Sequence, residues 1–289
     1  MNEHITYEGQ ELLPVTSDIV FKAIFSADEN RELLADLLNS YLDITPVSPD
    51  EIEIVSPENH RMYAQDKLSR LDLRIRTKNN EHIDIEIQVV DHKDMVRRSL
   101  YYTALLYTQQ MKKGMGYKEV GRAVSLNIVC YTINDESEYV NRYCMTNRVS
   151  KAELTDAMEM VFVELPKAAG AQDEERRALW TAFLSADSEE ELMKLSQKSE
   201  MIAKAVKKLK YVSADEVLRY EYDMKRKAEL DEGHRLAVAR REGIEEGEAD
   251  GLKKGAIEIA RRLLNAGNDA DMVSEMTGLS IKEVRALDP

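Results

Sequence analysis

The side chains most suited to catalysis lie in one short segment, Ile83 to Val89, with the sequence Ile-Asp-Ile-Glu-Ile-Gln-Val. Side chains of a β-strand point alternately to its two faces. The isoleucines and the valine therefore share one face, and Asp84, Glu86 and Gln88 share the other. A strand with one apolar face and one face carrying two carboxylates and an amide could bind a cation or orient a water molecule.

A neighbouring segment, Leu71 to Thr77, alternates in the same way and carries Asp72. The turn sequence Lys-Asn-Asn-Glu at 78–81 separates the two segments, so together they predict a β-hairpin. Counting outward from the turn pairs Asp72 with a residue near Ile87, which brings its carboxylate close to that of Glu86. Two carboxylates, with the Ile87 carbonyl as a further oxygen donor, form the kind of site that Mg²⁺ prefers.

A second interpretation of the hairpin needs no metal. A half-exposed strand shows the same alternation simply because its polar residues face water. The hairpin alone leaves both interpretations open, so the surrounding elements have to be considered.

The other predicted elements follow in a definite order along the chain. Apolar residues at helical spacing predict helices, and alternating or wholly apolar runs predict strands. The expected elements are a helix over 17–26, a helix over 30–42, a strand over 51–55, the hairpin, a long helix over 93–113, a buried strand over 123–133, a strand over 160–165, and helices alone from about 173.

This order resembles the core of the PD-(D/E)XK nucleases, and within that superfamily the chain is similar to the Rpn family of recombination-promoting nucleases and transposases. The similarity covers nearly the whole chain and implies an α/β fold of the α+β type. Its restriction-endonuclease-like core would hold a mixed central sheet flanked by helices, followed by a helical C-terminal region. The matching segments are 16–25, 33–42, 71–72, 85–88, 98–109, 162–167, the glycine-rich stretch and 277–280.

The resemblance implies a metal-dependent DNA endonuclease that hydrolyses phosphodiester bonds and promotes recombination. Asp72 and Glu86 would be metal ligands, and Asp18 would be an additional acidic residue that holds the metal or its water. The ion would be Mg²⁺, with Mn²⁺ or Ca²⁺ as alternatives. Gln88 stands where the superfamily name has a lysine. A lysine can stabilise an attacking hydroxide by its charge, whereas a glutamine can only orient the water or donate a hydrogen bond.

Four residues are candidates for contacts with DNA: Lys22, Arg97, Arg98 and Tyr101. Arg98 and Tyr101 are three residues apart, so they can share one face of a helix. We expect Arg98 to contact a phosphate or to support the active site. For the neighbouring Tyr102 a place in the core under the sheet is favoured.

Three regions are expected, a nuclease core over 1–170, a helical extension over 171–242, and a C-terminal part over 243–289. In the last region glycines recur every four residues, at 243, 247, 251 and 255. Such glycines let two helices approach closely, which favours a homo-oligomer. They also weaken a helix by about 1 kcal/mol each, which favours a flexible connector.

The closing segment, 269–287, predicts two short helices joined through Thr-Gly-Leu-Ser at 277–280. Helix, glycine turn and helix form the outline of a helix-turn-helix. The second helix offers only Lys282 and Arg285 to DNA, so a packing cap or an oligomerisation element is favoured over DNA reading.

The composition of the chain restricts the classes of protein to which it can belong. The net charge of −14 counts against a protein that coats nucleic acid, but permits a local basic site. No apolar run reaches the roughly 18 residues of a membrane span, and the polar start lacks a signal-peptide pattern, so we expect a cytoplasmic protein without membrane contact. Cys130 and Cys144, the only cysteines, match no zinc spacing. Beside the nuclease, two alternatives stay open: a catalytically weak or inactive scaffold or DNA-binding module of a mobile element or defence system, and a true transposase.

Overall fold

The computed structural model describes residues 5–7, 9–44, 46–55, 73–168 and 176–287. The chain divides into two compact units, residues 1–222 and residues 223–289. No helix in these described ranges combines the length and the hydropathy needed to cross a membrane.

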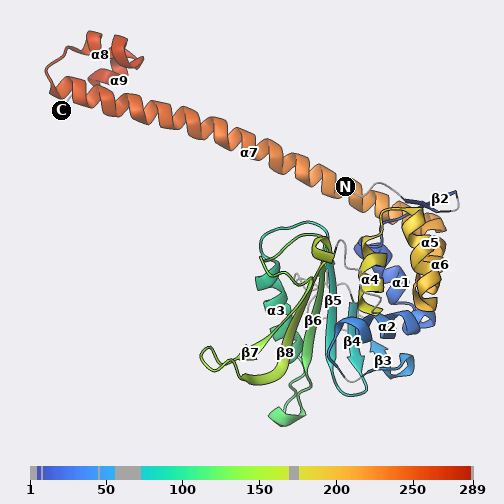
Figure 1. Cartoon of the computed structure of the whole chain (residues 1–289). Helices are drawn as coiled ribbons and strands as arrows, with labels where there is room; N and C mark the ends of the chain where they lie inside the picture. Colours follow the sequence, from blue (N-terminus) through green and yellow to red (C-terminus); the bar gives the residue numbers. More distant parts are fainter. Residues whose placement is uncertain (1–4, 8, 45, 56–72, 169–175, 288–289) are drawn as a thin grey trace. The chain divides into compact units, whose positions relative to one another are not determined.

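A six-stranded mixed sheet lies at the centre of the first unit (Figure 1). The order is β3-β4-β5-β6-β8-β7; β5 pairs in parallel with β6 and β6 with β8, and the other neighbours are antiparallel. This confirms the expected mixed sheet. The strands are β3 Ile52–Ile54, β4 Leu73–Thr77, β5 His82–Gln88, β6 Ala123–Val129, β7 Val140–Thr146 and β8 Glu153–Glu164. A separate two-stranded hairpin joins β1 Ile5–Tyr7 to β2 Gln10–Leu12.

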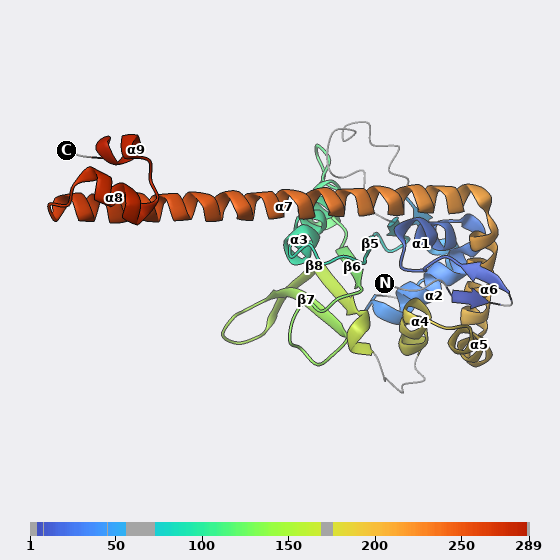
Figure 2. The same ribbon diagram turned by 90° about the horizontal axis from the view of Figure 1, so that it is seen from above.

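Helices cover both faces of the sheet, and the two views agree that α3 lies on the face opposite to α1, α2 and α4 (Figures 1 and 2). The face toward α1 and α2 is apolar, because Ile83, Ile85, Val124, Leu126 and Val161 all point there and are fully buried. Helices α5 and α6 pack against the others on this side. The helices are α1 Asp18–Phe25, α2 Arg31–Tyr41, α3 Met95–Thr108, α4 Arg176–Ser185, α5 Glu189–Lys198 and α6 Glu200–Ala214.

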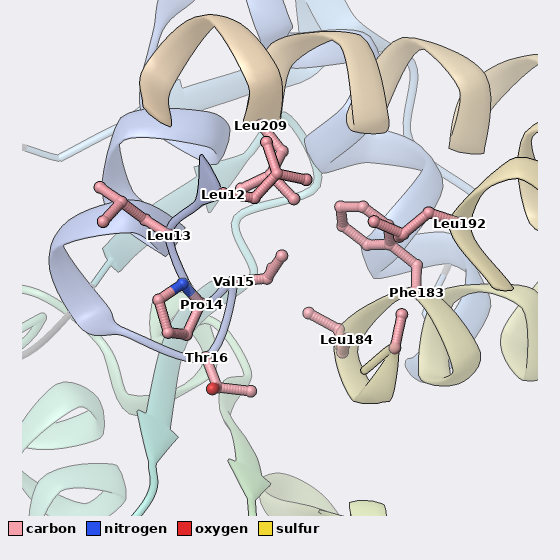
Figure 3. A pocket seen from close by; sticks show the side chains of 10 residues that line it. Leu12, Leu13, Pro14, Val15, Thr16, Phe183, Leu184, Leu192 and Leu209 are labelled. Carbon is pink, nitrogen blue, oxygen red and sulfur yellow. The ribbon is translucent and has the colours of Figure 1, made fainter. Parts of the chain in front are cut away.

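A small apolar cavity lies between the segment after β2 and helices α4 to α6 (Figure 3). Its volume of about 20 Å³ leaves room for one water molecule at most. Leu12, Val15, Phe183 and Leu209 are among its lining side chains. The cavity is a packing defect of the core and is too small for a ligand.

The sheet differs from the expected one at its far edge. The strand expected over 160–165 is the second half of β8, which begins at Glu153 and forms a hairpin with β7. Most of β7 is exposed, so its sequence lacks the apolar alternation that identifies a strand. The buried strand expected to reach Ile133 ends at Val129.

The second unit has a small helical core at the end of α7, whose bounds are Glu216–Asn265. Helices α8 Ala270–Thr277 and α9 Ile281–Arg285 pack there around Ala260, Val273, Leu279 and Val284. The Asp269 side chain caps α8, and Ser280 with Glu283 forms a capping box at the start of α9. Gly278 ends α8 with a φ of 71°, a conformation that favours glycine.

The glycine-rich stretch is helical within α7. A Cβ atom built on Gly243, Gly247, Gly251 or Gly255 would meet no atom within 4 Å beyond the neighbouring backbone of its own helix. The apolar residues that follow, Ile257, Leu263 and Leu264, pack against the small core of their own chain.

Candidate active site

The polar face of β5 is buried beneath helix α3. Asp84 is 1% exposed and Glu86 is 2% exposed. The interpretation of this face as the wet side of a half-exposed strand is therefore wrong. A carboxylate loses much favourable hydration on burial, so it is retained only where charges, hydrogen bonds or a metal ion compensate for that loss.

Hydrogen-bonded side chains on β6 and α3 surround these carboxylates. The register of β5 and β6 places Ser125 beside Asp84 and Asn127 beside Glu86. Ser99 of α3 donates to the Ser125 hydroxyl over 3.2 Å, and the Asn127 amide donates to the Ser99 hydroxyl over 2.9 Å. All three side chains are at most 1% exposed. This network fixes α3 over the polar face of the sheet.

Arg98 of α3 forms an ion pair with the carboxylate of Glu86. The side chains are 28% and 3% exposed, so the pair is largely shielded from water. The guanidinium carbon also lies 5.6 Å from the centre of the Tyr102 ring. Tyr102 is buried, as expected for a core aromatic, and burial raises the pKa of its hydroxyl. Arg98 thus supports the carboxylate, and its guanidinium stays partly accessible.

Gln88 ends β5 on the same face as Glu86. Its amide nitrogen donates to the carbonyl of Val90 over 3.1 Å, and its backbone carbonyl accepts the N–H of Cys130 over 3.0 Å. The side-chain amide is therefore held at the carboxyl end of β5, two residues beyond Glu86.

Asp18 begins α1, and its Oδ1 accepts the N–H of Ile19 over 2.8 Å. Helix α1 packs against β5 on the apolar face of the sheet, whereas Glu86 and Gln88 share the face covered by α3.

Asp72 lies outside the described residues. It directly precedes Leu73, and Leu73 is paired with Ile85, the residue before Glu86. Among the residues that the structure describes, no group of three or more His, Cys, Asp and Glu side chains could hold a metal ion. The described donors, the Glu86 and Asp18 carboxylates, are hard oxygen ligands and fit Mg²⁺ or Mn²⁺ in kind.

The predicted DNA contacts lie on two helices. Arg97 and Tyr101 are exposed on α3, and Tyr101 as a whole residue is 57% exposed. Arg98 is the half-buried partner of Glu86. Lys22 lies near the middle of α1, on the other face of the sheet.

Sequence reasoning missed Tyr131, which follows the end of β6. Its hydroxyl is buried, and the structure shows no hydrogen-bond partner for it among the described residues. Burial raises the pKa of this hydroxyl, as do the nearby carboxylates of Asp91, Glu86 and Asp94, whereas Arg98 lowers it.

Comparison with known protein families supports both the fold of the central sheet with its helices and the assignment of the C-terminal helices. Residues 15–239 match the model of the PD-(D/E)XK nuclease family transposase. Residues 253–289 match that of the Rpn/YhgA-like nuclease family, C-terminal HTH domain. No curated protein and no solved structure gave a match.

The first match covers well over half of the chain and includes all six strands of the central sheet. The second covers α8, α9 and the end of α7, which confirms the helix-turn-helix outline. The chain therefore belongs to the PD-(D/E)XK nuclease family of transposases, and it ends in the C-terminal helix-turn-helix domain of the Rpn nucleases.

Proposed function

We propose that the protein is a metal-dependent endodeoxyribonuclease that hydrolyses phosphodiester bonds in DNA. The observation that carries the proposal is the buried carboxylate of Glu86 on the central strand of a PD-(D/E)XK core, held by Arg98 and followed on the same strand face by Gln88. A buried carboxylate on a strand costs stability, and a function at the site explains why it is kept.

Asp72, Glu86 and Asp18 are the proposed ligands of a divalent cation. Such a cation lowers the pKa of bound water and neutralises charge on the phosphate. Asp72 is proposed because of its place in the chain, one residue before Leu73, which pairs with the residue before Glu86. Mg²⁺ is the expected ion, with Mn²⁺ and Ca²⁺ as alternatives, since all three prefer oxygen ligands.

Other side chains are proposed to orient the attacking water, balance charge and contact DNA. Gln88, whose nitrogen donates to Val90, has its amide oxygen available to orient the attacking water. Arg98 balances the charge of Glu86 and can also face a phosphate with its accessible edge. Lys22, Arg97 and Tyr101 are proposed to contact the DNA backbone near the site.

DNA binding is proposed to be local and sensitive to salt. The net charge of −14 disfavours a broad phosphate-binding surface. The C-terminal helix-turn-helix offers exposed Lys282 and Arg285 on its second helix as a further set of contacts. We further propose that the protein works in the cytoplasm, promotes recombination, and forms a homo-oligomer through its C-terminal helices.

A second function rests on two observations of its own. Gln88 replaces the lysine of the superfamily name, and Arg98 already provides a positive charge to Glu86. A scaffold or DNA-binding module without catalysis would be consistent with both. Incubating purified protein with supercoiled plasmid and Mg²⁺ or Mn²⁺ separates the two: nicking that stops in Asp72→Ala supports the nuclease, and DNA binding without nicking supports the module.

A further inference from the structure

Helix α7 is exposed on all sides over residues 226–255. Every residue of this stretch except Val238 is exposed. A helix in water is only marginally stable by itself, and most helices in proteins are stabilised by packing one face against another element. Glycines within a helix weaken it further. The stretch therefore has the properties of a helix that is stabilised by a partner.

One face of this stretch carries three large side chains at four-residue spacing, those of Leu236, Arg240 and Ile244. Leu236 is 65% exposed and Ile244 is 52% exposed, and all three border a shallow hollow on the helix surface. Residues three, four or seven positions apart share one face of a helix. By this spacing the same face also carries the glycines at 243, 247 and 251.

The large side chains and the glycines match each other when a second copy of the helix runs antiparallel to the first. If Leu236 lies opposite residue 251 of the second copy, Arg240 lies opposite residue 247 and Ile244 lies opposite residue 243. Each large side chain then meets a glycine, which leaves room for it beside the backbone. A parallel pair in equal register would instead place each large side chain opposite the same side chain of the other copy.

The charges along α7 favour the same direction. Residues 235–241 carry three arginines and no carboxylate, whereas residues 242–250 carry five carboxylates and no lysine or arginine. A parallel pair in equal register would place each block beside the block of like charge, which is unfavourable. The antiparallel pair places the acidic block of one copy beside Arg240 and Arg241 of the other, with Arg241 opposite Glu246.

We infer that α7 is the surface on which two copies of this chain associate, as an antiparallel helix pair with its two-fold axis between Gly243 and Ile244. The inference rests on the proposed homo-oligomer and specifies the face and the direction of the contact. It also keeps the two helix-turn-helix domains apart, because each packs around Ala260, about 25 Å along the helix from that axis.

Disulfide cross-linking tests the direction in the full-length chain, with Cys130 and Cys144 replaced by alanine. In this background Leu236→Cys, Gly251→Cys and the double variant Leu236→Cys/Gly251→Cys are oxidised mildly and separated on a non-reducing gel. The double variant should form covalent dimers, and each single variant should stay largely uncross-linked. In the antiparallel pair a position 236 lies about 22 Å along the axis from position 236 of the other copy, whereas a disulfide needs Cα atoms within about 7 Å.

Val238→Cys/Ala249→Cys is the matched control for the face. These two positions lie opposite each other along the axis in the same register, but each is two residues from the contact face and points away from it. The control should cross-link at least tenfold less than the double variant at positions 236 and 251.

Charge reversal tests the energetics by light scattering. Arg240→Glu/Arg241→Glu should weaken association roughly tenfold, because attraction between the blocks becomes repulsion. An equimolar mixture with Glu245→Arg/Glu246→Arg should recover the association. Weakening without recovery would mean that the two blocks do not face each other, and would overturn the inference.

Two further outcomes would also overturn it, and they separate it from the proposed homo-oligomer. If wild type is a dimer and the single variants cross-link as well as the double variant, the copies associate but run parallel. If wild type is a monomer at the concentration used for cross-linking, both the antiparallel pair and the proposed homo-oligomer fail, and plasmid cleavage still decides the nuclease independently.

Discussion

The guanidinium of Arg98 and the carboxylate of Glu86 form an ion pair between helix α3 and strand β5, in which Glu86 is buried and Arg98 is partly exposed. This pair joins the helix with the candidate DNA contacts to the strand with the candidate metal ligand. Arg98 therefore acts on the chemistry through Glu86 as well as on any bound phosphate.

Replacing Arg98 with alanine should reduce both stability and cleavage. Removing one partner of a buried ion pair leaves an uncompensated buried charge and typically costs about 3–5 kcal/mol. Saturating Mn²⁺ should recover part of this loss, because the cation supplies the positive charge that Arg98 provided. Urea unfolding with and without Mn²⁺ measures both effects.

Arg97 is the matched control for stability, because it is the neighbouring arginine of α3 and is exposed. Arg97→Ala should change the unfolding free energy by about 0.5 kcal/mol or less. Equal stabilities for Arg98→Ala and Arg97→Ala would mean that the ion pair with Glu86 contributes nothing.

Much of the site could be predicted from the sequence because it depends on local rules. The turn at 78–81, with Asn80 at a φ of 60°, joins two strands whose alternation determines which residues share a face. The alternation alone therefore predicts that Glu86 and Gln88 share one face of a strand. That this face is buried could not be predicted from alternation, because burial depends on where α3 packs.

Gln88→Ala should lower the cleavage rate and leave metal-induced stabilisation nearly unchanged. The amide orients water in the proposed site but is not a proposed ligand. Gln88→Lys should cleave at least as fast as wild type, because it restores the charge usual in the superfamily. Thermal shifts with Mn²⁺ measured beside plasmid nicking test both variants; an equal loss of metal stabilisation and rate in Gln88→Ala would make Gln88 a ligand instead.

The helix-turn-helix should contribute few phosphate contacts. In Lys282→Ala/Arg285→Ala, duplex affinity should fall, and the slope of log affinity against log salt should decrease by about 1–2. Lys194→Ala, an exposed lysine of α5 paired with Glu190, is the control. An unchanged slope in the double variant would favour the small C-terminal core as a packing or oligomerisation element.

Self-association should depend on the glycines of α7. Alanine at Gly247 and Gly251 meets open space in the single chain and should stabilise the helix by about 1 kcal/mol per site. In a closely packed helix pair the added methyl groups would separate the helices. Light scattering should show an oligomer for wild type, a weaker one for Gly247→Ala/Gly251→Ala, and a monomer after truncation at residue 242. A monomeric wild type would contradict the prediction.

Other features could not be predicted because they depend on contacts distant in sequence. The backbone N–H of Ile133, in the loop after β6, donates to the Glu164 carboxylate, which lies 31 residues away in the sequence. Strand β7 is recognisable as a strand only through its pairing with β8, since its own residues are mostly exposed. Sequence periodicity reports local burial, and neither feature leaves a strong local pattern.

The two carboxylates at the centre of the account are not equivalent as targets for mutation. Glu86→Ala removes the partner of Arg98 and should destabilise the fold. Glu86→Gln keeps the size and shape of the side chain, but it also removes the negative charge that faces Arg98. Asp72→Ala is therefore the more informative variant, paired with Asp50→Ala, an exposed aspartate just before β3, as control.

The most direct test is a thermal-shift titration of wild type and Asp72→Ala with Mn²⁺, run beside plasmid cleavage on the same samples. Wild type should gain thermal stability with Mn²⁺ and nick the plasmid, because the cation relieves repulsion between the proposed ligands. Asp72→Ala should gain less and should not nick, whereas Asp50→Ala should behave as wild type. Cleavage by Asp72→Ala at the wild-type rate, or equal stabilisation of both proteins by Mn²⁺, would contradict the proposed metal site.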